Sequence, residues 1–316
     1  MEYLTIVFIV LLIIIVTIIL INSKIKADKK LKMQLLSSFG KPPDEDEYEL
    51  ESIKKYSHYK KAHIIDELRI DDITWNDLNM DKVFKRINVC LTSIGEEYLY
   101  NCLHELQSEP SRLLEREKII EFFTDNPEER LTAQFYLAKM GKVKYNGLTS
   151  LIFNPDIKLF SYPKIFNFLS ILPLLFALTL FYSIPIGIFC TLLSFLINLA
   201  VYIYSKRKVD VEIPAISYFA SILYCCKKLC RINRMGSLPL IAELKSKYCV
   251  FKSLEGKLPL PRAITGNIME AFYEYFNILF LIDIRNYNKY TKMIIKHNND
   301  FYSLYKAIDL FDNPKI

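Results

Sequence analysis

The chain has 316 residues, of which 52% are hydrophobic and 24% are charged, and its formal net charge is +6. This length suffices for two soluble units, or for one soluble unit together with membrane spans. Only 8 glycines and 13 prolines are present, and no segment repeats at a fixed period, so the composition argues against long low-complexity linkers and a repeat array.

The first element expected is a transmembrane anchor at residues 1–23. Tyr3 to Ser23 carry no charge for 21 residues, and at about 1.5 Å per residue that stretch crosses a hydrocarbon core of roughly 30 Å. A cleaved signal peptide is the alternative. It fits less well, because the preceding segment is not basic and no small-x-small cleavage site follows.

Residues 24–68 are predicted to form a linker with one short helix, containing the acidic stretch "GKPPDEDEYELESIKKY". A helical core then begins at residues 69–164. After a cap at Asn79 or Asp81, apolar residues recur at steps of three and four up to Tyr98, the period of a helix with one apolar face. Further helices are predicted at 95–107, 111–124 and 127–140.

A transmembrane helical hairpin is predicted at residues 165–204. The run from Ile165 to Ser205 is uncharged for 41 residues, about twice what one span needs, and "FYSIPIG" (181–187) supplies a reversal near its middle. Basic residues flank the run and follow the first span, so both hairpin ends and the core are expected to face the cytoplasm, in a multi-pass protein of the cell membrane. A buried hairpin of a soluble protein is the alternative.

Residues 205–316 are predicted to form the second part of the helical core. Helical periods run through 211–234, 236–253, 266–283 and 286–311, and "YCVF" (248–251) is the best strand candidate. The fold class expected is therefore mainly α: an N-terminal transmembrane helix and a helical bundle that a transmembrane hairpin interrupts.

A basic cluster in this second part is the candidate contact for phosphates, either of nucleic acid or of anionic lipid. Residues 205–316 hold 18 basic against 10 acidic residues. The spacing places three cations on one helical face, and the alternative is a solvated face beside a membrane. The cluster consists of Lys227, Lys228, Arg231 and Arg234.

No motif for catalysis, metal binding or cofactor binding is found. The four histidines are scattered, and "CCKKLC" (225–230) lacks the paired spacing of a zinc site. Gly-Lys occurs at 40–41, 141–142 and 256–257, but none completes the GxxxxGK[ST] phosphate loop. We therefore expect no enzyme activity and no cofactor in this chain, with ATP and Mg²⁺ relevant only if an ATPase domain is supplied elsewhere.

One stretch of the first core segment resembles a known family. Thr92-x-x-Gly95-x-x-x-Leu99, followed by "EPSRLLEREKIIEFF" with Pro110, Arg116 and Phe122, is similar to the start of the helical core and lever region of the MutS family. The longer text from "DDITWNDLNMDKVF" to "LAKMGK" resembles a membrane-attached MutS-related branch. In that branch transmembrane helices precede and interrupt the core, and a P-loop ATPase domain closes the chain.

The resemblance, over about residues 70–314, implies a helical core that is non-catalytic alone and acts as a lever, clamp or scaffold for an ATPase domain or partner. It also implies a homodimer or an ATPase partner, with DNA as a further candidate. Gly95 is expected at a close helix approach, Thr92 and Ser93 at a helix cap, and Glu96 reaching back to Ser93. The alternative function is a membrane scaffold or anionic-lipid-binding protein without a DNA role.

Three departures from the family pattern stand out. Glu97 occupies a position where the repair proteins tend to carry Arg, and the chain stops at "LFDNPKI", where the ATPase domain is expected. The N-terminal mismatch-reading domain with its Phe-x-Glu wedge is not found either. Mismatch recognition by that wedge is therefore not expected.

Overall fold

The computed structural model describes residues 2–43, 49–63, 68–106, 110–143, 147–153, 159–210, 212–254 and 267–312. Over these residues the protein is helical, with fifteen α-helices and three short 3₁₀ helices and no strand. The prediction of a mainly α fold is confirmed.

The part before the hairpin contains eight helices. They are α1 (Glu2–Ser38), α2 (Leu50–His63), α3 (Asp72–Asp77), α4 (Met80–Ile87), α5 (Ser93–His104), α6 (Pro110–Asp125), α7 (Pro127–Met140) and α8 (Leu148–Phe153). Helix α1 continues without a break from the predicted anchor into the predicted linker, over 37 residues, or about 55 Å. Several side chains of the predicted span 1–23 lie outside the described residues, so that span stays a prediction.

The apolar pattern from Val83 to Tyr98 does not form one helix as predicted. Helix α4 ends at Ile87, and Asn88 is extended, with its side-chain oxygen accepting a hydrogen bond from the Cys90 amide at 3.1 Å. Helix α5 then starts afresh at Ser93. An asparagine that satisfies the backbone of the following turn interrupts the helix although the hydrophobic period continues.

The predicted hairpin is present as two helices that are long and apolar enough to cross a membrane. They are α9 (Pro163–Leu178), extended by η1 (Thr179–Phe181), and α10 (Ile184–Lys208). Only 17% and 22% of their most apolar stretches are buried inside the protein. A hairpin in a soluble core would be mostly buried, so this exposure favours the membrane over the soluble alternative.

After the hairpin the chain forms the remaining helices. They are α11 (Glu212–Leu229), η2 (Asn233–Ser237), α12 (Pro239–Phe251), η3 (Lys252–Leu254), α13 (Asn267–Phe280), α14 (Ile282–Lys296) and α15 (Asn298–Asp312). The predicted strand 248–251 is wrong, because it is the last turn of α12. Ile241, Leu244, Tyr248 and Phe251 are buried at helical spacing on one face of that helix.

Helix α11 is the centre of the core. It packs against α7, α8, α12, α14 and α15, and its buried residues lie on all sides of the helix, as expected for a helix enclosed by others. One hydrophobic cluster joins residues from before, within and after the hairpin, from Tyr56 to Phe311. The hairpin is thus inserted into a single packed core.

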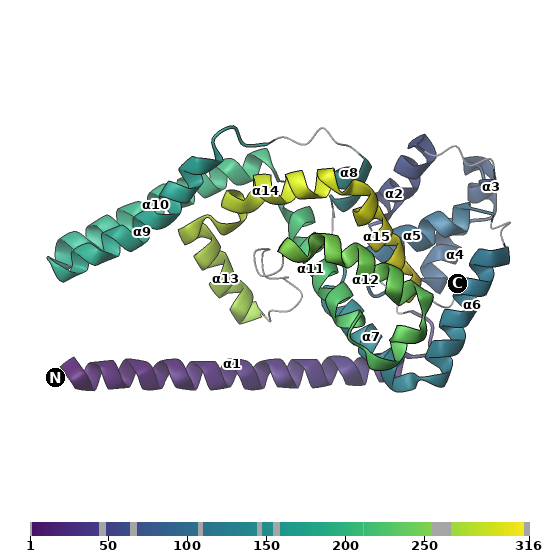
Figure 1. Ribbon diagram of the computed structural model, residues 1–316, viewed down its shortest axis with the longest axis horizontal. Coiled ribbons are helices and arrows are strands. Elements are labelled where there is room, and N and C mark those ends of the chain that lie inside the picture. Colours follow the sequence, from purple (N-terminus) through teal and green to yellow (C-terminus); the bar gives the residue numbers. More distant parts are fainter. Residues whose placement is uncertain are drawn as a thin grey trace.

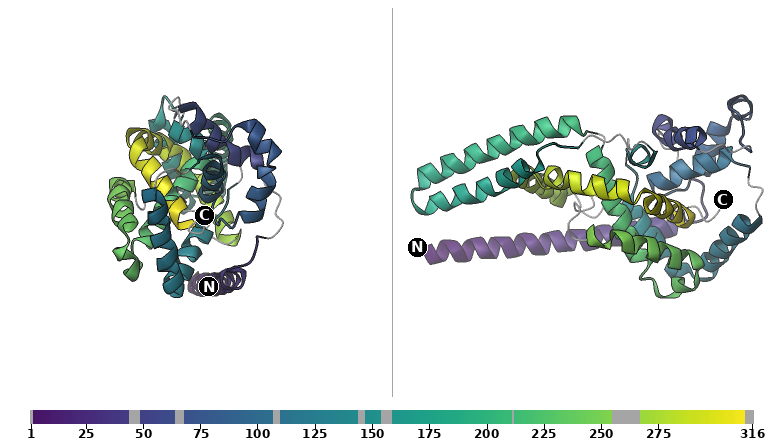
Figure 2. Two further views of the ribbon diagram at one scale, coloured as in Figure 1. Left: turned by 90° about the vertical axis from the view of Figure 1, so that its right-hand side faces the viewer. Right: turned by 45° about the horizontal axis from the view of Figure 1, so that its top comes forward.

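The N-terminal end of α1 and the tip of the α9–α10 hairpin lie at the same end of the molecule (Figure 1). A second view shows both projecting from the core in the same direction (Figure 2). Their outward side chains are apolar: Ile19 is 58% exposed, and Phe189 is 66% exposed.

Candidate functional site

The second half of α1 docks along α7. Asp28 forms an ion pair with Lys139, with Nζ and Oδ1 2.9 Å apart. The ammonium groups of Lys32 and Lys139 both lie over the ring of Phe135, at 5.0 and 4.7 Å from its centroid. Leu35, one turn further on, is buried. Asp28, Lys32 and Leu35 are spaced by four and three residues, so they lie on one face of α1, and this face packs against the core.

The docked face ends at a cation–π contact. The guanidinium of Arg130 in α7 lies 3.6 Å from the ring centroid of Phe39, and it donates a hydrogen bond to the Phe123 carbonyl at 3.1 Å. Gly40 follows with a φ of +78°, a left-handed conformation that glycine adopts without strain, and the Lys41 amide donates to the Ser38 carbonyl at 3.1 Å, so the chain turns there.

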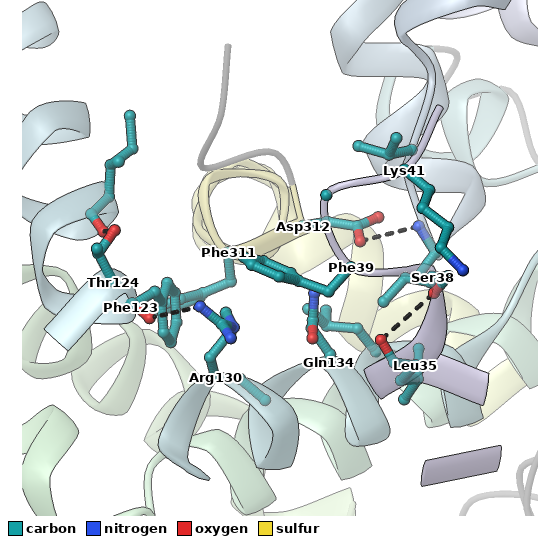
Figure 3. Close-up of a pocket in the computed structure, with 16 residues that line it drawn as sticks. Leu35, Ser38, Phe39, Lys41, Phe123, Thr124, Arg130, Gln134, Phe311 and Asp312 are labelled. Atoms are coloured by element: carbon teal, nitrogen blue, oxygen red, sulfur yellow. Dashed lines mark hydrogen bonds between the residues drawn. The ribbon is translucent and has the colours of Figure 1, made fainter. Parts of the chain in front are cut away.

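A cavity of about 120 Å³ lies at this junction, between the end of α1, helices α6 and α7, and the tip of α15 (Figure 3). Its walls are mainly apolar, with Arg130 on one side and Asp312 on the other. The end of α1, helices α6 and α7, and the C-terminal end of α15 therefore meet around one small space, which we call the anchor junction.

At the anchor junction, hydrogen bonds to Asp312 connect the end of α15 to the start of α5. Its two carboxyl oxygens accept from the amides of Leu91 and Thr92, both at 2.9 Å, and from the Thr92 hydroxyl at 2.7 Å. The Thr92 hydroxyl in turn accepts from the Gly95 amide at 3.0 Å. Burial raises the pKa of Asp312 to about 6, although these hydrogen bonds act in the opposite direction.

Gly95 lies against this carboxyl group. A Cβ atom placed on Gly95 would overlap Asp312 Oδ2 and lie 3.1 Å from Cys90 Cβ. The predicted cap partner Ser93 is engaged differently: its amide donates to the Tyr218 hydroxyl at 3.1 Å, and its hydroxyl donates to the Val143 carbonyl. Glu96 does not reach back to Ser93 but accepts from the Asn88 side chain at 2.8 Å. Of the predicted cap residues, only Thr92 caps α5.

Glu97, which departs from the family pattern, is 2% exposed. Its Oε2 accepts hydrogen bonds from Thr149 at 2.7 Å and from Tyr305 at 2.6 Å. Burial raises the pKa of Tyr305 well above its ordinary value, so its proton stays in this bond. The carboxylate therefore ties α5 to α8 and α15, a role that an arginine could not take, because it accepts no hydrogen bonds.

The other family-like positions are structural. Leu99 is buried in a second, smaller cluster around Trp75, and Phe122 packs half-buried against the main core. Pro110 is the first residue of α6. Arg116 donates to the Cys102 sulfur at 3.3 Å, and burial raises the pKa of that thiol to about 12. A thiol with so high a pKa is a poor nucleophile.

The basic cluster does not lie on one helical face, because α11 ends at Leu229. Lys227 and Lys228 are half-buried in its last turn, and the Lys228 ammonium lies 5.4 Å from the centroid of the Tyr224 ring. Arg231 is exposed beyond the helix end. Arg234 belongs to η2 and is 3.4 Å from a carboxyl oxygen of Glu129. Lys228 thus has an aromatic partner and Arg234 an acidic one.

No group of three or more potential metal ligands occurs among the residues that the structure describes. His104 stacks on Trp75, with ring centroids 3.6 Å apart, and burial lowers its pKa. Its neighbour Glu105 pairs with Lys60 and Arg69. These adjacent residues serve separate structural contacts.

The sequence reasoning missed Asp312 and Arg130. Nothing in their local sequence marks them, since each gains its role from a partner far along the chain: Thr92 for Asp312, and Phe39 for Arg130.

No family model, no curated protein and no solved structure matches this chain. The resemblance to the MutS family therefore stays a prediction.

Proposed function

We propose that this protein is a membrane-anchored helical scaffold, with no chemistry of its own, whose core holds a partner at the bilayer surface. The observation that carries the proposal is that α1 and the α9–α10 hairpin project from the same end of the core (Figures 1 and 2). Helices that cross one membrane from one packed core must leave it in a common direction.

The anchor junction supports a second part of the proposal, that the core acts as a lever. Helix α1 runs from the membrane segment to Arg130 without interruption, and the cavity there also contacts Asp312. Asp312 is bonded to the start of α5. A tilt of α1 in the membrane would therefore reach α5 and α15 through rigid elements, as would a load applied to α15 by a partner.

A labelling experiment tests the topology. Cys249 is exposed on the core, and Tyr182, at the hairpin tip, is 90% exposed. In sealed native vesicles, a membrane-impermeant maleimide should label Cys249 from one side, and Tyr182→Cys, in a Cys249→Ser background, from the other side only. Labelling of both positions from the same side would refute the transmembrane hairpin.

Recovery of a partner tests the scaffold role. The chain tagged within its core is extracted from native membranes in mild detergent, and its partners and native mass are determined. We expect a P-loop ATPase or a second copy of this chain, as the MutS-like lever reading requires. Arg130→Gln, which removes the contact with Phe39 but leaves the membrane helices intact, should weaken the recovery. A monomer without partners would contradict the proposal.

The alternative candidate is phosphate binding by Lys227, Lys228, Arg231 and Arg234. Arg234 pairs with the first turn of α7, at the end of the molecule away from the hairpin tip (Figure 1). That position favours nucleic acid over the lipid of the anchoring bilayer. Arg231→Glu with Arg234→Glu should abolish duplex DNA binding at low salt, whereas Lys85→Glu with Arg86→Glu, on exposed α4 side chains, serves as the charge-matched control. Equal DNA binding by the wild type and both double variants would refute a phosphate site at this cluster.

A further inference from the structure

Asn198 fixes helix α13 against the hairpin. Pro173 in α9 has no amide hydrogen, so the carbonyl of Leu169, four residues earlier, lacks its helical donor. The Asn198 side-chain amide donates to that carbonyl at 3.1 Å and to the carbonyl of Leu279 at 2.7 Å. Leu279 lies in the last turn of α13, where carbonyls have no partner within the helix. One amide thus satisfies two carbonyls that their own helices leave unpaired.

This contact sets the level of α13 along the hairpin. Asn198 is 14 residues after Ile184, the start of α10, which corresponds to about 21 Å from the tip. A hydrocarbon core of roughly 30 Å measured from the tip ends close to Lys206, Arg207 and Lys208. The C-terminal end of α13 therefore lies at the depth of the leaflet nearest the helical core.

Between residues 273 and 280, where the side chains of α13 are described, its polar groups point inward. Glu274 accepts a hydrogen bond from the Tyr202 hydroxyl at 3.4 Å, and the Asn277 amide donates to Asp283 at 2.6 Å. Tyr273 donates to the other oxygen of Asp283 at 3.0 Å. These bonds occupy the face that α13 turns to α10 and α14.

Over the same residues, the other face of α13 carries exposed aromatic side chains. Tyr275 is 64% exposed and Phe276 is 54% exposed, and the rings of Phe276 and Phe280 stack one turn apart, with centroids separated by 6.0 Å. In Figure 1, α13 lies between the base of the hairpin and α1 and is inclined to both. Tyrosine accumulates at the membrane–water interface, so Tyr275 suits the core-side edge of this leaflet, and the two phenylalanine rings suit its acyl chains.

We propose that α13 is an interfacial helix, with Tyr275, Phe276 and Phe280 embedded in the lipid leaflet nearest the core. The inference rests on the proposed function, since it needs the hairpin in a membrane. Lipid is the occupant because this face continues the exposed apolar surface of the hairpin at the same depth. A soluble partner would have to enter the headgroup layer to reach it.

Tryptophan quenching by brominated lipid tests this proposal. The protein has one tryptophan, Trp75, which is 5% exposed and supplies the baseline. Tyr275→Trp is reconstituted in phosphatidylcholine vesicles carrying bromine near either the carbonyl end or the methyl end of the acyl chains. We expect its added fluorescence to fall at least about two-fold, more with the shallow bromines than with the deep ones. Phe276→Trp repeats the measurement if the first variant does not fold.

Two controls separate this inference from the proposed function. Leu192→Trp, 56% exposed in the hairpin, should be quenched most by the deep bromines, and Ile73→Trp, 74% exposed on α3, should not be quenched. Quenching of Leu192→Trp without quenching at 275 or 276 overturns the interfacial helix and leaves the membrane hairpin intact. If neither region is quenched, both proposals are wrong.

Discussion

Asn198→Leu should destabilise the hairpin and its union with α13. The substitution keeps the approximate volume of the side chain but removes the amide that reaches Leu169 and Leu279. Both carbonyls would then lie without a donor in a water-poor environment, where an unpaired backbone group is costly.

The expected loss follows from the two hydrogen bonds. Interhelical hydrogen bonds in membrane proteins average about 0.6 kcal/mol, which sets a lower bound of about 1 kcal/mol for the pair. A buried carbonyl left unpaired costs about 1–3 kcal/mol. The Asn198 Oδ1 atom is itself buried without a partner among the described residues, so removing it offsets part of this cost. We therefore expect a loss of about 1–4 kcal/mol, or a fall in Tm of roughly 2–8 °C.

Melting in mild detergent micelles measures the loss. A thiol-reactive fluorogenic dye reports unfolding, because Cys225 and Cys226 are fully buried in the native core. The decisive comparison is Asn198→Leu in a Pro173→Ala background, where the restored amide hydrogen at 173 supplies the Leu169 carbonyl. In that background Asn198→Leu should cost roughly half as much. Equal costs in both backgrounds would show that Asn198 does not compensate for the proline, and the argument would be wrong.

Three further predictions concern the core. Gly95→Ala should destabilise the protein by about 1–3 kcal/mol, because the added Cβ would overlap Asp312. Gly236→Ala is the control, since no atom lies within 4 Å of its added Cβ. Equal urea midpoints for the two variants would contradict the prediction. Burial raises the pKa of Asp312 from 3.8 to about 6, so its contribution to stability should fall as pH rises between about 4 and 6, by up to about 3 kcal/mol. The wild-type minus Asp312→Asn difference in unfolding free energy should show that slope, and a flat or rising difference would refute it. Arg234→Ala should change stability by less than about 0.5 kcal/mol, because the Arg234 side chain is 70% exposed in its pair with Glu129 and its hydrogen bond to the Asn126 side chain, at 3.5 Å, is exposed as well. A larger change in the urea midpoint would refute this prediction.

The helical fold and the hairpin could be predicted because both depend on local signals. A 41-residue uncharged run with a central proline and glycine contains its own reversal, and periods of three and four persist through most of the core. The prediction failed where a side chain redirects the backbone. Asn88 bonds to the Cys90 amide and separates α4 from α5, while "YCVF" has the composition of a strand and the position of a helix end.

The candidate site was less accessible to sequence reasoning. Asp312 accepts a hydrogen bond from Thr92, 220 residues away along the chain, and Asn198 donates one to a carbonyl that a proline in another helix leaves without its helical donor. Neither hydrogen bond leaves a local sequence pattern, because its partners come together only when the helices pack. The basic cluster shows the converse: its spacing looked helical, but the helix ends at Leu229 before the pattern is complete.

The uninterrupted course of α1 has a consequence for how the core meets other molecules at the membrane. Its segment from residue 24 to residue 38 is a stiff strut of about 22 Å, while the base of the hairpin joins the core directly. Two rigid connections to the membrane, α1 and the hairpin, restrict rotation of the core, whereas a single flexible linker would allow it. If α1 and the hairpin lie in one bilayer, the core has a fixed orientation relative to the membrane plane. A partner that diffuses on the membrane surface then always approaches the same side of the core. Encounter then becomes a two-dimensional search with the orientation already set.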